Sequence, residues 1–96
     1  MIASFADDTS KDIFDGTDSK AARRIPKVAW PVARRKLDLL NGATGLKDLR
    51  VPPANRLERL KGDLIAFWSI RVNDQYRVIF RFDGGNASDV RVADYH

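Results

Sequence analysis

FWSIRV (residues 67–72) and YRVIFRF (residues 76–82) are two runs of aromatic and β-branched residues, and the short segment NDQ (residues 73–75) separates them. Residues of the first kind favour extended strands, whereas Asn and Asp favour tight turns. The pattern predicts a β-hairpin. It contains the strongest strand signals in the chain, and the rest of the fold is built outward from it.

The register of this hairpin depends on the length of its turn. A three-residue turn places every large apolar residue of both runs on one face, except Phe67 and Ile79. A two-residue turn mixes the two faces, so the longer turn is expected. The expected pairs are Val72 with Tyr76, Ile70 with Val78 and Trp68 with Phe80.

The same register sets Arg71 directly opposite Arg77 on the other face, with Arg81 one step along. Like charges on directly opposed residues are destabilising. Two explanations stay open at this point. Either an anion binds at these arginines, or their long side chains splay apart into water.

A second hairpin is expected at DGGN (residues 83–86), because these residue types are typical of hairpin turns. In the strand that follows, apolar and polar residues alternate: Val90, Val92 and Asp94 on one side, and Arg91, Ala93 and Tyr95 on the other. The two hairpins together predict a small, twisted antiparallel sheet. A helix should cover one face and leave the other face cationic.

The N-terminal segment predicts a short strand followed by a short helix. Ile2, Ser4 and Phe5 fit a strand by their residue types, although they alternate poorly. Asp8 and Thr9 can cap a helix of one or two turns that ends at Gly16. Residues 17–24 have the composition of a polar connection.

A longer helix is expected over residues 26–41, ending near Asn41 and Gly42. Its buried stripe comprises Ile25, Val28, Ala29, Val32, Leu37 and Leu40. Pro31 removes a backbone donor, so the helix either kinks at this residue or begins there. We therefore expect an α+β fold, with an N-terminal strand and two helices packed on the twisted antiparallel sheet.

The segment between this helix and the first hairpin is irregular. Residues 46–49 can form a single helical turn, and the two prolines of residues 51–55 exclude a regular helix or a central strand there. Residues 56–62 are basic and fit an edge strand or a loop.

Length and composition narrow the class of protein. The 96 residues predict one domain, residues 1–96, and no apolar run approaches the roughly 18 residues of a membrane span. Residues 1–6 lack the features of a secretory signal, so a cytoplasmic protein is expected. With no cysteine, one histidine and scattered carboxylates, we expect no metal site and no cofactor.

The charge of the chain is unevenly distributed. Residues 1–18 contain five of the 13 acidic side chains and one of the 17 basic ones. Residues 19–96 therefore hold 8 acidic and 16 basic side chains, a formal charge of +8. This asymmetry favours a polyanionic partner, although a basic surface that only aids solubility fits the composition equally well.

His96, the only histidine, ends the chain in the sequence Asp94-Tyr95-His96. A group with a pKa near neutrality beside a cationic surface suggests RNA cleavage. The alternative is a frayed chain end with no chemical role.

These features together resemble the HigB branch of the RelE/ParE toxin superfamily of bacterial toxin-antitoxin pairs. The resemblance covers nearly the whole chain. It rests on LKGD (residues 60–63), on WSIRV followed by NDQYRVIF (residues 68–80), and on the closing DYH (residues 94–96).

The resemblance implies a ribosome-dependent endoribonuclease that cuts messenger RNA in the decoding site of the 70S ribosome. It also implies a HigA-like antitoxin with a helix-turn-helix domain, through which the complex would bind operator DNA. No membrane partner is implied. The implied catalytic residues are Lys61, Arg77, Asp94, Tyr95 and His96.

In the expected reaction, the RNA 2′-hydroxyl attacks the adjacent phosphate without a metal ion. His96 would transfer the proton, oriented by Asp94 or by the C-terminal carboxylate, and Tyr95 would donate its hydroxyl or stack on a base. Arg77 and Lys61 would stabilise the growing negative charge. Arg56, Arg59 and Arg71 are expected to bind flanking phosphates or ribosomal RNA.

Two positions depart from the family pattern. Glu58 stands where relatives can carry histidine, and Asn73 stands where they can carry a basic residue. Glu58 could accept a proton, but a salt bridge to Arg56 or Lys61 is the favoured interpretation.

Two other functions stay open, because a fold does not determine a function. One is a toxin of the same fold that acts on a protein such as DNA gyrase without cutting RNA. The other is an RNA-binding module. The DYH ending argues against both.

Overall fold

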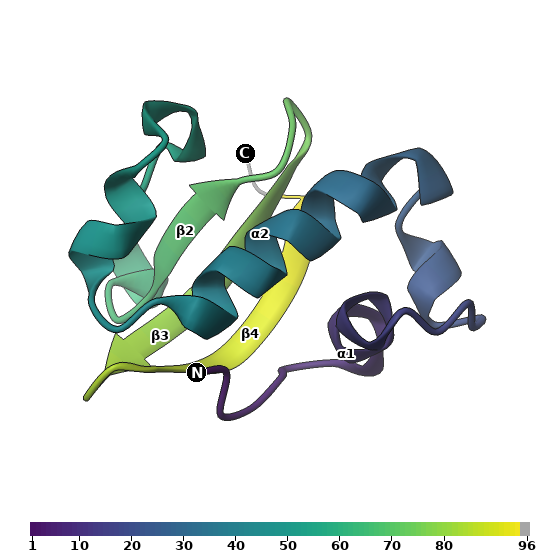
Figure 1. Cartoon of the computed structure of the whole chain (residues 1–96), viewed down its shortest axis with the longest axis horizontal. Coiled ribbons are helices and arrows are strands. Elements are labelled where there is room, and N and C mark those ends of the chain that lie inside the picture. Colours follow the sequence, from purple (N-terminus) through teal and green to yellow (C-terminus); the bar gives the residue numbers. More distant parts are fainter. Residues whose placement is uncertain (95–96) are drawn as a thin grey trace.

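Antiparallel pairing in the order β1-β2-β3-β4 defines the sheet of this chain, whose computed structural model describes residues 1–94 (Figure 1). The strands are β1 (Glu58–Arg59), β2 (Trp68–Arg71), β3 (Tyr76–Asp83) and β4 (Asn86–Asp94). The helices are α1 (Asp8–Asp15) and α2 (Trp30–Gly42). The 3-10 turns are η1 (Ala22–Arg24), η2 (Lys27–Ala29), η3 (Leu46–Arg50), η4 (Pro53–Asn55) and η5 (Gly62–Leu64). The expected α+β class is confirmed.

The first hairpin has the register expected from its apolar pattern. Trp68 pairs with Phe80 and Ile70 with Val78, so both strands present their large apolar residues to one side. The side chain of Asn73 stabilises the turn, because its Oδ1 accepts hydrogen bonds from the backbone N–H groups of Gln75 and Tyr76, at 2.9 and 2.7 Å. The departure at Asn73 therefore has a local structural role.

The N-terminal strand is the part of the expected fold that differs most. Residues 1–6 make two isolated parallel bridges to β4, Ile2 with Ala87 and Phe5 with Val90, rather than a continuous strand. The Oδ1 of Asp7 accepts a hydrogen bond from Ser10 N at 2.8 Å, so Asp7 is the cap of α1, one residue before the expected cap. The expected end at Gly16 is confirmed, with φ of 77°.

Helix α2 begins at Trp30, which decides between the two possibilities for Pro31. Pro31 lies in the first turn of α2. Backbone N–H groups have no intrahelical acceptor in the first turn, so the lack of an N–H in proline costs no hydrogen bond there. The preceding residues form η2 instead, and the Trp30 indole Nε1 donates to the Ile25 carbonyl at 2.8 Å. Val28 is 87% exposed, so it is not part of the expected buried stripe.

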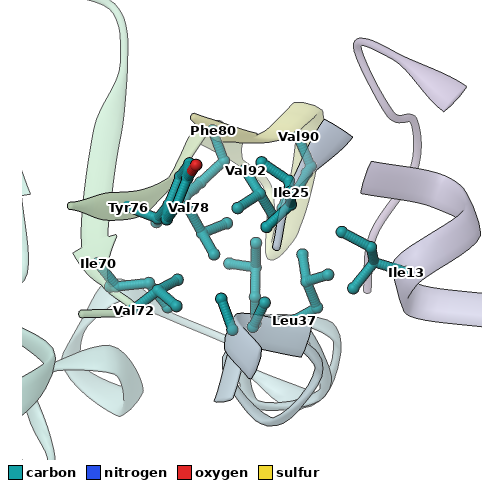
Figure 2. Close-up of a cluster of buried hydrophobic side chains, with 14 of the residues drawn as sticks. Ile13, Ile25, Leu37, Ile70, Val72, Tyr76, Val78, Phe80, Val90 and Val92 are labelled. Carbon is teal, nitrogen blue, oxygen red and sulfur yellow. The ribbon is translucent and has the colours of Figure 1, made fainter. Parts of the chain in front are cut away.

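The hydrophobic core lies between α2 and one face of the sheet (Figure 2). The side chain of Leu37 points from α2 toward the sheet, and Ile13 of α1 packs at one side. The other face is less open than expected, because Ile79 is only 1% exposed and Leu60 only 5%. Cationic side chains on that face therefore surround a small apolar region. Within residues 1–94, no helix is long and apolar enough to cross a membrane.

Part of the basic surface of α2 is integrated into the fold, not simply solvated. The Lys36 ammonium donates a hydrogen bond to the side chain of buried Asn55. The Asn55 Nδ2 in turn donates to the carbonyls of Leu49 and Val51, both at 3.2 Å. Burial, followed by the charges of Arg35 and Arg71, lowers the pKa of Lys36 from its ordinary value. Lys36 thus anchors residues 49–55 beside the sheet.

The second hairpin supplies a stability test with a matched control. Gly84 and Gly85 have φ angles of 57° and 80°, and a Cβ added at Gly85 would lie 3.3 Å from the Thr44 carbonyl oxygen. We expect Gly85→Ala to lower the free energy of unfolding by about 1–2 kcal/mol. Gly42→Ala should be neutral or stabilise by up to about 1 kcal/mol, since nothing lies within 4 Å of its added Cβ. Urea unfolding of both variants measures the difference, and equal destabilisation would contradict the account.

Candidate active site

The sheet face turned away from α2, called here the open face, carries the candidate site. Alternation along the strands places on it the neighbours of the core residues. Its residues in β2, β3 and β4 form two rows across the sheet, Ser69-Ile79-Arg91 and Arg71-Arg77-Ala93. Arg81 of β3 continues the same face beyond a β-bulge.

Arg77 is the most firmly held cation of the open face. Its Nε donates to the hydroxyl of Ser69 at 2.8 Å, and its Nη2 donates to the carbonyl of Arg56 at 2.6 Å. The carboxylate of Glu58 lies 4.0 Å from the same Nη2. The Arg77 side chain is only 15% exposed, so these contacts act in a partly desolvated environment. The guanidinium is therefore preorganised on the sheet.

The residues that orient Arg77 were not identified from the sequence. Ser69 is fully buried, and its role depends on its place across the strand pair. Arg56 has a positive φ of 46°, and its backbone carbonyl, not its side chain, contacts Arg77. The hairpin register could have indicated Ser69, because it places this serine on the same face as Arg71 and Arg77. The Arg56 carbonyl could not have been found, because a backbone acceptor has no signature in the sequence.

Arg71 and Arg77 lie directly opposite each other, as the hairpin register requires. Each has an acidic neighbour of its own within the chain. Asp74 of the turn pairs with Arg71, and Glu58 of β1 pairs with Arg77. The facing arginines are therefore tolerated without an external anion.

Glu58 does not form the expected salt bridge with Arg56 or Lys61. It lies opposite Ser69 across β1 and β2, and this position brings its carboxylate to Arg77 instead. The pair is partly exposed, with Glu58 60% accessible, so its contribution to stability is small. Its main effect is to reduce the positive potential beside Arg77.

The other expected RNA-binding and catalytic cations are dispersed. Lys61 is exposed and precedes η5, next to the end of β1. Arg56 is exposed, whereas Arg59 is paired with Trp68 on the helix-facing side of the sheet, where its Nε donates to the Ile65 carbonyl at 2.9 Å. The structure therefore does not bring Arg59 to the open face.

Asp94 occupies the end of β4 opposite Tyr76. Since Tyr76 belongs to the core face, the register places Asp94 on that side of the sheet and Arg77 on the other. The Oδ2 of Asp94 accepts a hydrogen bond from Gln75 Nε2 at 3.1 Å. Tyr95 and His96, the two remaining expected catalytic residues, lie outside the described residues. In residues 1–94, no three His, Cys, Asp or Glu side chains gather as metal ligands.

Residues 3–96 match the family model described as the RelE-like toxin of the type II toxin-antitoxin system HigB. This chain belongs to the HigB-like toxin family. The HigB-like toxin is 41% identical over 87 residues to Toxin HigB-1 of Vibrio cholerae, covering 91% of this chain and 90% of that one. It is 30% identical over 98 residues to Endoribonuclease HigB of Proteus vulgaris, covering 100% of both chains. The expected family is confirmed.

Solved structures show the same fold at low sequence identity. The HigB-like toxin superposes on the YoeB/ParE toxin from Agrobacterium tumefaciens with a TM-score of 0.55 and 17% identity, covering 100% of both chains. A chain of the YoeB-YefM complex from Staphylococcus aureus gives a TM-score of 0.54 at 17% identity, with coverage of 100% of this chain and 98% of that one. The two helices packed on a four-stranded antiparallel sheet are thus the fold of this group of toxins.

Ser69 provides a test of how the open face works. Ser69→Ala removes the acceptor of the Arg77 Nε hydrogen bond, so the guanidinium should lose its fixed orientation. If Arg77 acts on substrate, the maximal rate should fall about tenfold or more, with little change in KM. Ser69→Thr keeps a hydroxyl and should restore most of the rate.

The melting temperatures of both Ser69 variants control for a purely structural role. A loss of activity in Ser69→Ala that follows its loss of folded protein, and no rescue by threonine, would contradict the positioning role. Full activity in Ser69→Ala would contradict it as well.

Proposed function

We propose that this HigB-like toxin is a ribosome-dependent endoribonuclease that cuts messenger RNA in the decoding site and thereby stops translation and growth. The observation that carries the proposal is the geometry of Arg77. A guanidinium that two hydrogen bonds hold on a cationic sheet face is suited to stabilise a phosphate whose negative charge increases. The relative named Endoribonuclease HigB supports the same activity.

The proposed chemistry requires no metal ion. The 2′-hydroxyl of one nucleotide attacks the adjacent phosphorus, and the bond to the 5′-oxygen of the next nucleotide breaks. The products are a 2′,3′-cyclic phosphate and a 5′-hydroxyl. Arg77 and Lys61 stabilise the phosphate oxygens, and His96 transfers the proton, with Tyr95 as a further member of the site. Asp94, which the register places on the α2 side of the sheet, acts from the end of β4 by orienting His96.

Dependence on the ribosome follows from the small number of groups available. One histidine cannot by itself bring free RNA into line for attack by the 2′-hydroxyl. The decoding site would hold the messenger in a fixed conformation and supply that geometry. The protein would accordingly act in the cytoplasm, where messenger RNA is translated.

The ends of the cut RNA test the chemistry. A messenger carrying one 2′-deoxynucleotide immediately before the cut should resist cleavage at that bond, while neighbouring bonds stay sensitive. The products of the natural messenger should carry a 5′-hydroxyl, detected by labelling with polynucleotide kinase without prior phosphatase treatment. Cleavage of the deoxy-substituted bond at the normal rate would refute attack by the 2′-hydroxyl.

The proposed partner is a HigA-like antitoxin with a helix-turn-helix domain, through which the complex binds operator DNA. The family description as a type II system supports such a partner. Helix α2 covers the face of the sheet opposite the open face, and α1 lies beside the β4 edge, so an antitoxin bound to these helices leaves the open face uncovered (Figure 1). Inhibition would then come from the bulk of the complex, which does not fit the ribosome.

Crosslinking of the purified complex, followed by mass spectrometry, tests this placement. Crosslinks from the antitoxin should reach α1 and α2. Crosslinks confined to residues 56–96 would place the antitoxin over the candidate site and overturn the proposed mode of inhibition.

A further inference from the structure

Arg91 is a cation of the open face that the proposed catalytic set does not include. It lies in β4 directly opposite Ile79, in the row that begins with Ser69. Its position is diagonal to Arg77, one strand over and two residues along. Such diagonal neighbours are separated by about 7–8 Å between their Cα atoms.

Among the residues that the structure describes, Arg91 differs from the other arginines of the open face in having no side-chain partner. Arg71 pairs with Asp74, Arg77 with Ser69 and Glu58, and Arg81 with Asp89 at 3.4 Å. The guanidinium of Arg91 makes no hydrogen bond, ion pair or cation-π contact anywhere in the part of the chain that the structure describes. The nearest acid along its strand, Asp89, is already paired.

The environment of Arg91 makes this lack of a partner informative. Its side chain is half-buried, and its cross-strand neighbour Ile79 is buried and apolar. A guanidinium that is partly removed from water loses hydration, and no carboxylate of the described chain compensates the loss. An external anion that accepts two parallel hydrogen bonds would compensate the lost hydration of the guanidinium, and phosphate has the required geometry.

We propose that Arg91 binds an RNA phosphate that flanks the phosphate held at Arg77. The diagonal separation of the two arginines is comparable with the spacing of successive phosphates in an extended RNA strand. The RNA would then run obliquely across β3 and β4, over the apolar region at Ile79. This inference rests on the proposed function for the identity of the polyanion, whereas the anion site at Arg91 stands on geometry alone.

The test uses a fluorescein-labelled single-stranded RNA of eight nucleotides, 2′-O-methylated throughout so that no attacking hydroxyl is present. Fluorescence anisotropy measures its Kd for the purified toxin over a range of salt concentrations. Arg91→Ala should weaken binding about tenfold and reduce the slope of log Kd against log salt by about 0.7, the value for one phosphate contact on a single strand. Arg91→Lys should keep the slope, because the charge remains.

The matched control is Arg24→Ala, which removes an exposed arginine of η1, on the side of the molecule that carries α1 (Figure 1). It should leave both Kd and slope unchanged, and circular dichroism confirms that each variant is folded. Wild-type affinity and slope in folded Arg91→Ala would overturn the proposal. So would an equal loss in Arg24→Ala, or no binding by the wild-type toxin at the lowest salt.

Failure of this inference differs visibly from failure of the proposed function. If the wild-type toxin cuts messenger on the ribosome and Arg91→Ala binds RNA normally, only the Arg91 site is wrong. If the wild-type toxin never cuts, yet Arg91→Ala loses RNA binding, the anion site is correct and the nuclease is not.

Discussion

Replacement of Arg77 by alanine is expected to reduce messenger cleavage by about a hundredfold to a thousandfold, the loss typical of removing one preorganised donor to a charged transition state. The large effect is expected because Arg77 is fixed by Ser69 and by the Arg56 carbonyl before substrate binds. The measurement is the single-turnover rate of cutting of a defined messenger on the ribosome. Arg77→Lys should recover only a small part, because lysine cannot reproduce the planar pair of donors.

The control for Arg77→Ala is the stability of the variant. Removing the guanidinium leaves the Ser69 hydroxyl buried without its donor, so a moderate fall in melting temperature is expected as well. The rate must therefore be measured with folded protein below that temperature. A folded Arg77→Ala variant that cuts within about threefold of the wild-type rate would remove Arg77 from the catalytic set.

Phe80→Ala should have the largest effect on stability. Phe80 of β3 is fully buried and belongs to the hydrophobic core (Figure 2). Truncation of a buried phenylalanine costs about 3–5 kcal/mol. At roughly 4–8 °C per kcal/mol for a chain of this size, the melting temperature should fall by more than about 12 °C. Thermal unfolding followed by circular dichroism measures the shift.

Val28→Ala is the control for this core substitution, because Val28 is 87% exposed and also loses methyl groups. Its free energy of unfolding should change by less than about 0.5 kcal/mol. If Phe80→Ala and Val28→Ala were equally stable, the placement of the core between α2 and the sheet would be wrong.

Both hairpins could be predicted from the sequence because their information is local. The alternation of apolar residues in 67–82 has one register that gives a single apolar face, and the structure has that register. The C-terminal ends of α1 at Gly16 and of α2 at Gly42 could be predicted for the same reason, whereas α2 begins at Trp30, four residues after the expected start. The sequence left open whether Pro31 kinks α2 or begins it, because proline is found both in the first turn of a helix and at a kink within one.

Contacts between distant segments could not be predicted in this way. Residues 1–6 pair with β4 more than 80 positions away, and nothing in their own pattern indicates a parallel partner. Glu58 reaches Arg77 because β1 pairs with β2, and this pairing depends on an edge strand of only two residues. The Arg56 carbonyl is likewise invisible to side-chain patterns.

For the candidate site as well, local patterns could be predicted from the sequence and contacts between distant segments could not. Arg71 and Arg77 were predicted to face each other from register alone, and they do. Lys61, Tyr95, His96 and Asp94 were assigned through the resemblance to the toxin family, and their catalytic roles stay predictions. Ser69 and Arg91 emerge only from the structure. Ser69 matters because its hydroxyl accepts a hydrogen bond from Arg77, and Arg91 matters because its side chain has no partner within residues 1–94.

The most direct test of the account adds purified toxin, and separately its His96→Ala variant, to ribosomes that translate a defined messenger. Primer extension then maps the new RNA ends, with a ribosome-free reaction as the control. We expect cuts that require both the ribosome and His96. Equal cutting by His96→Ala, efficient cutting of naked messenger, or growth inhibition without any cuts would contradict it, and the last result would direct attention to a protein target such as DNA gyrase.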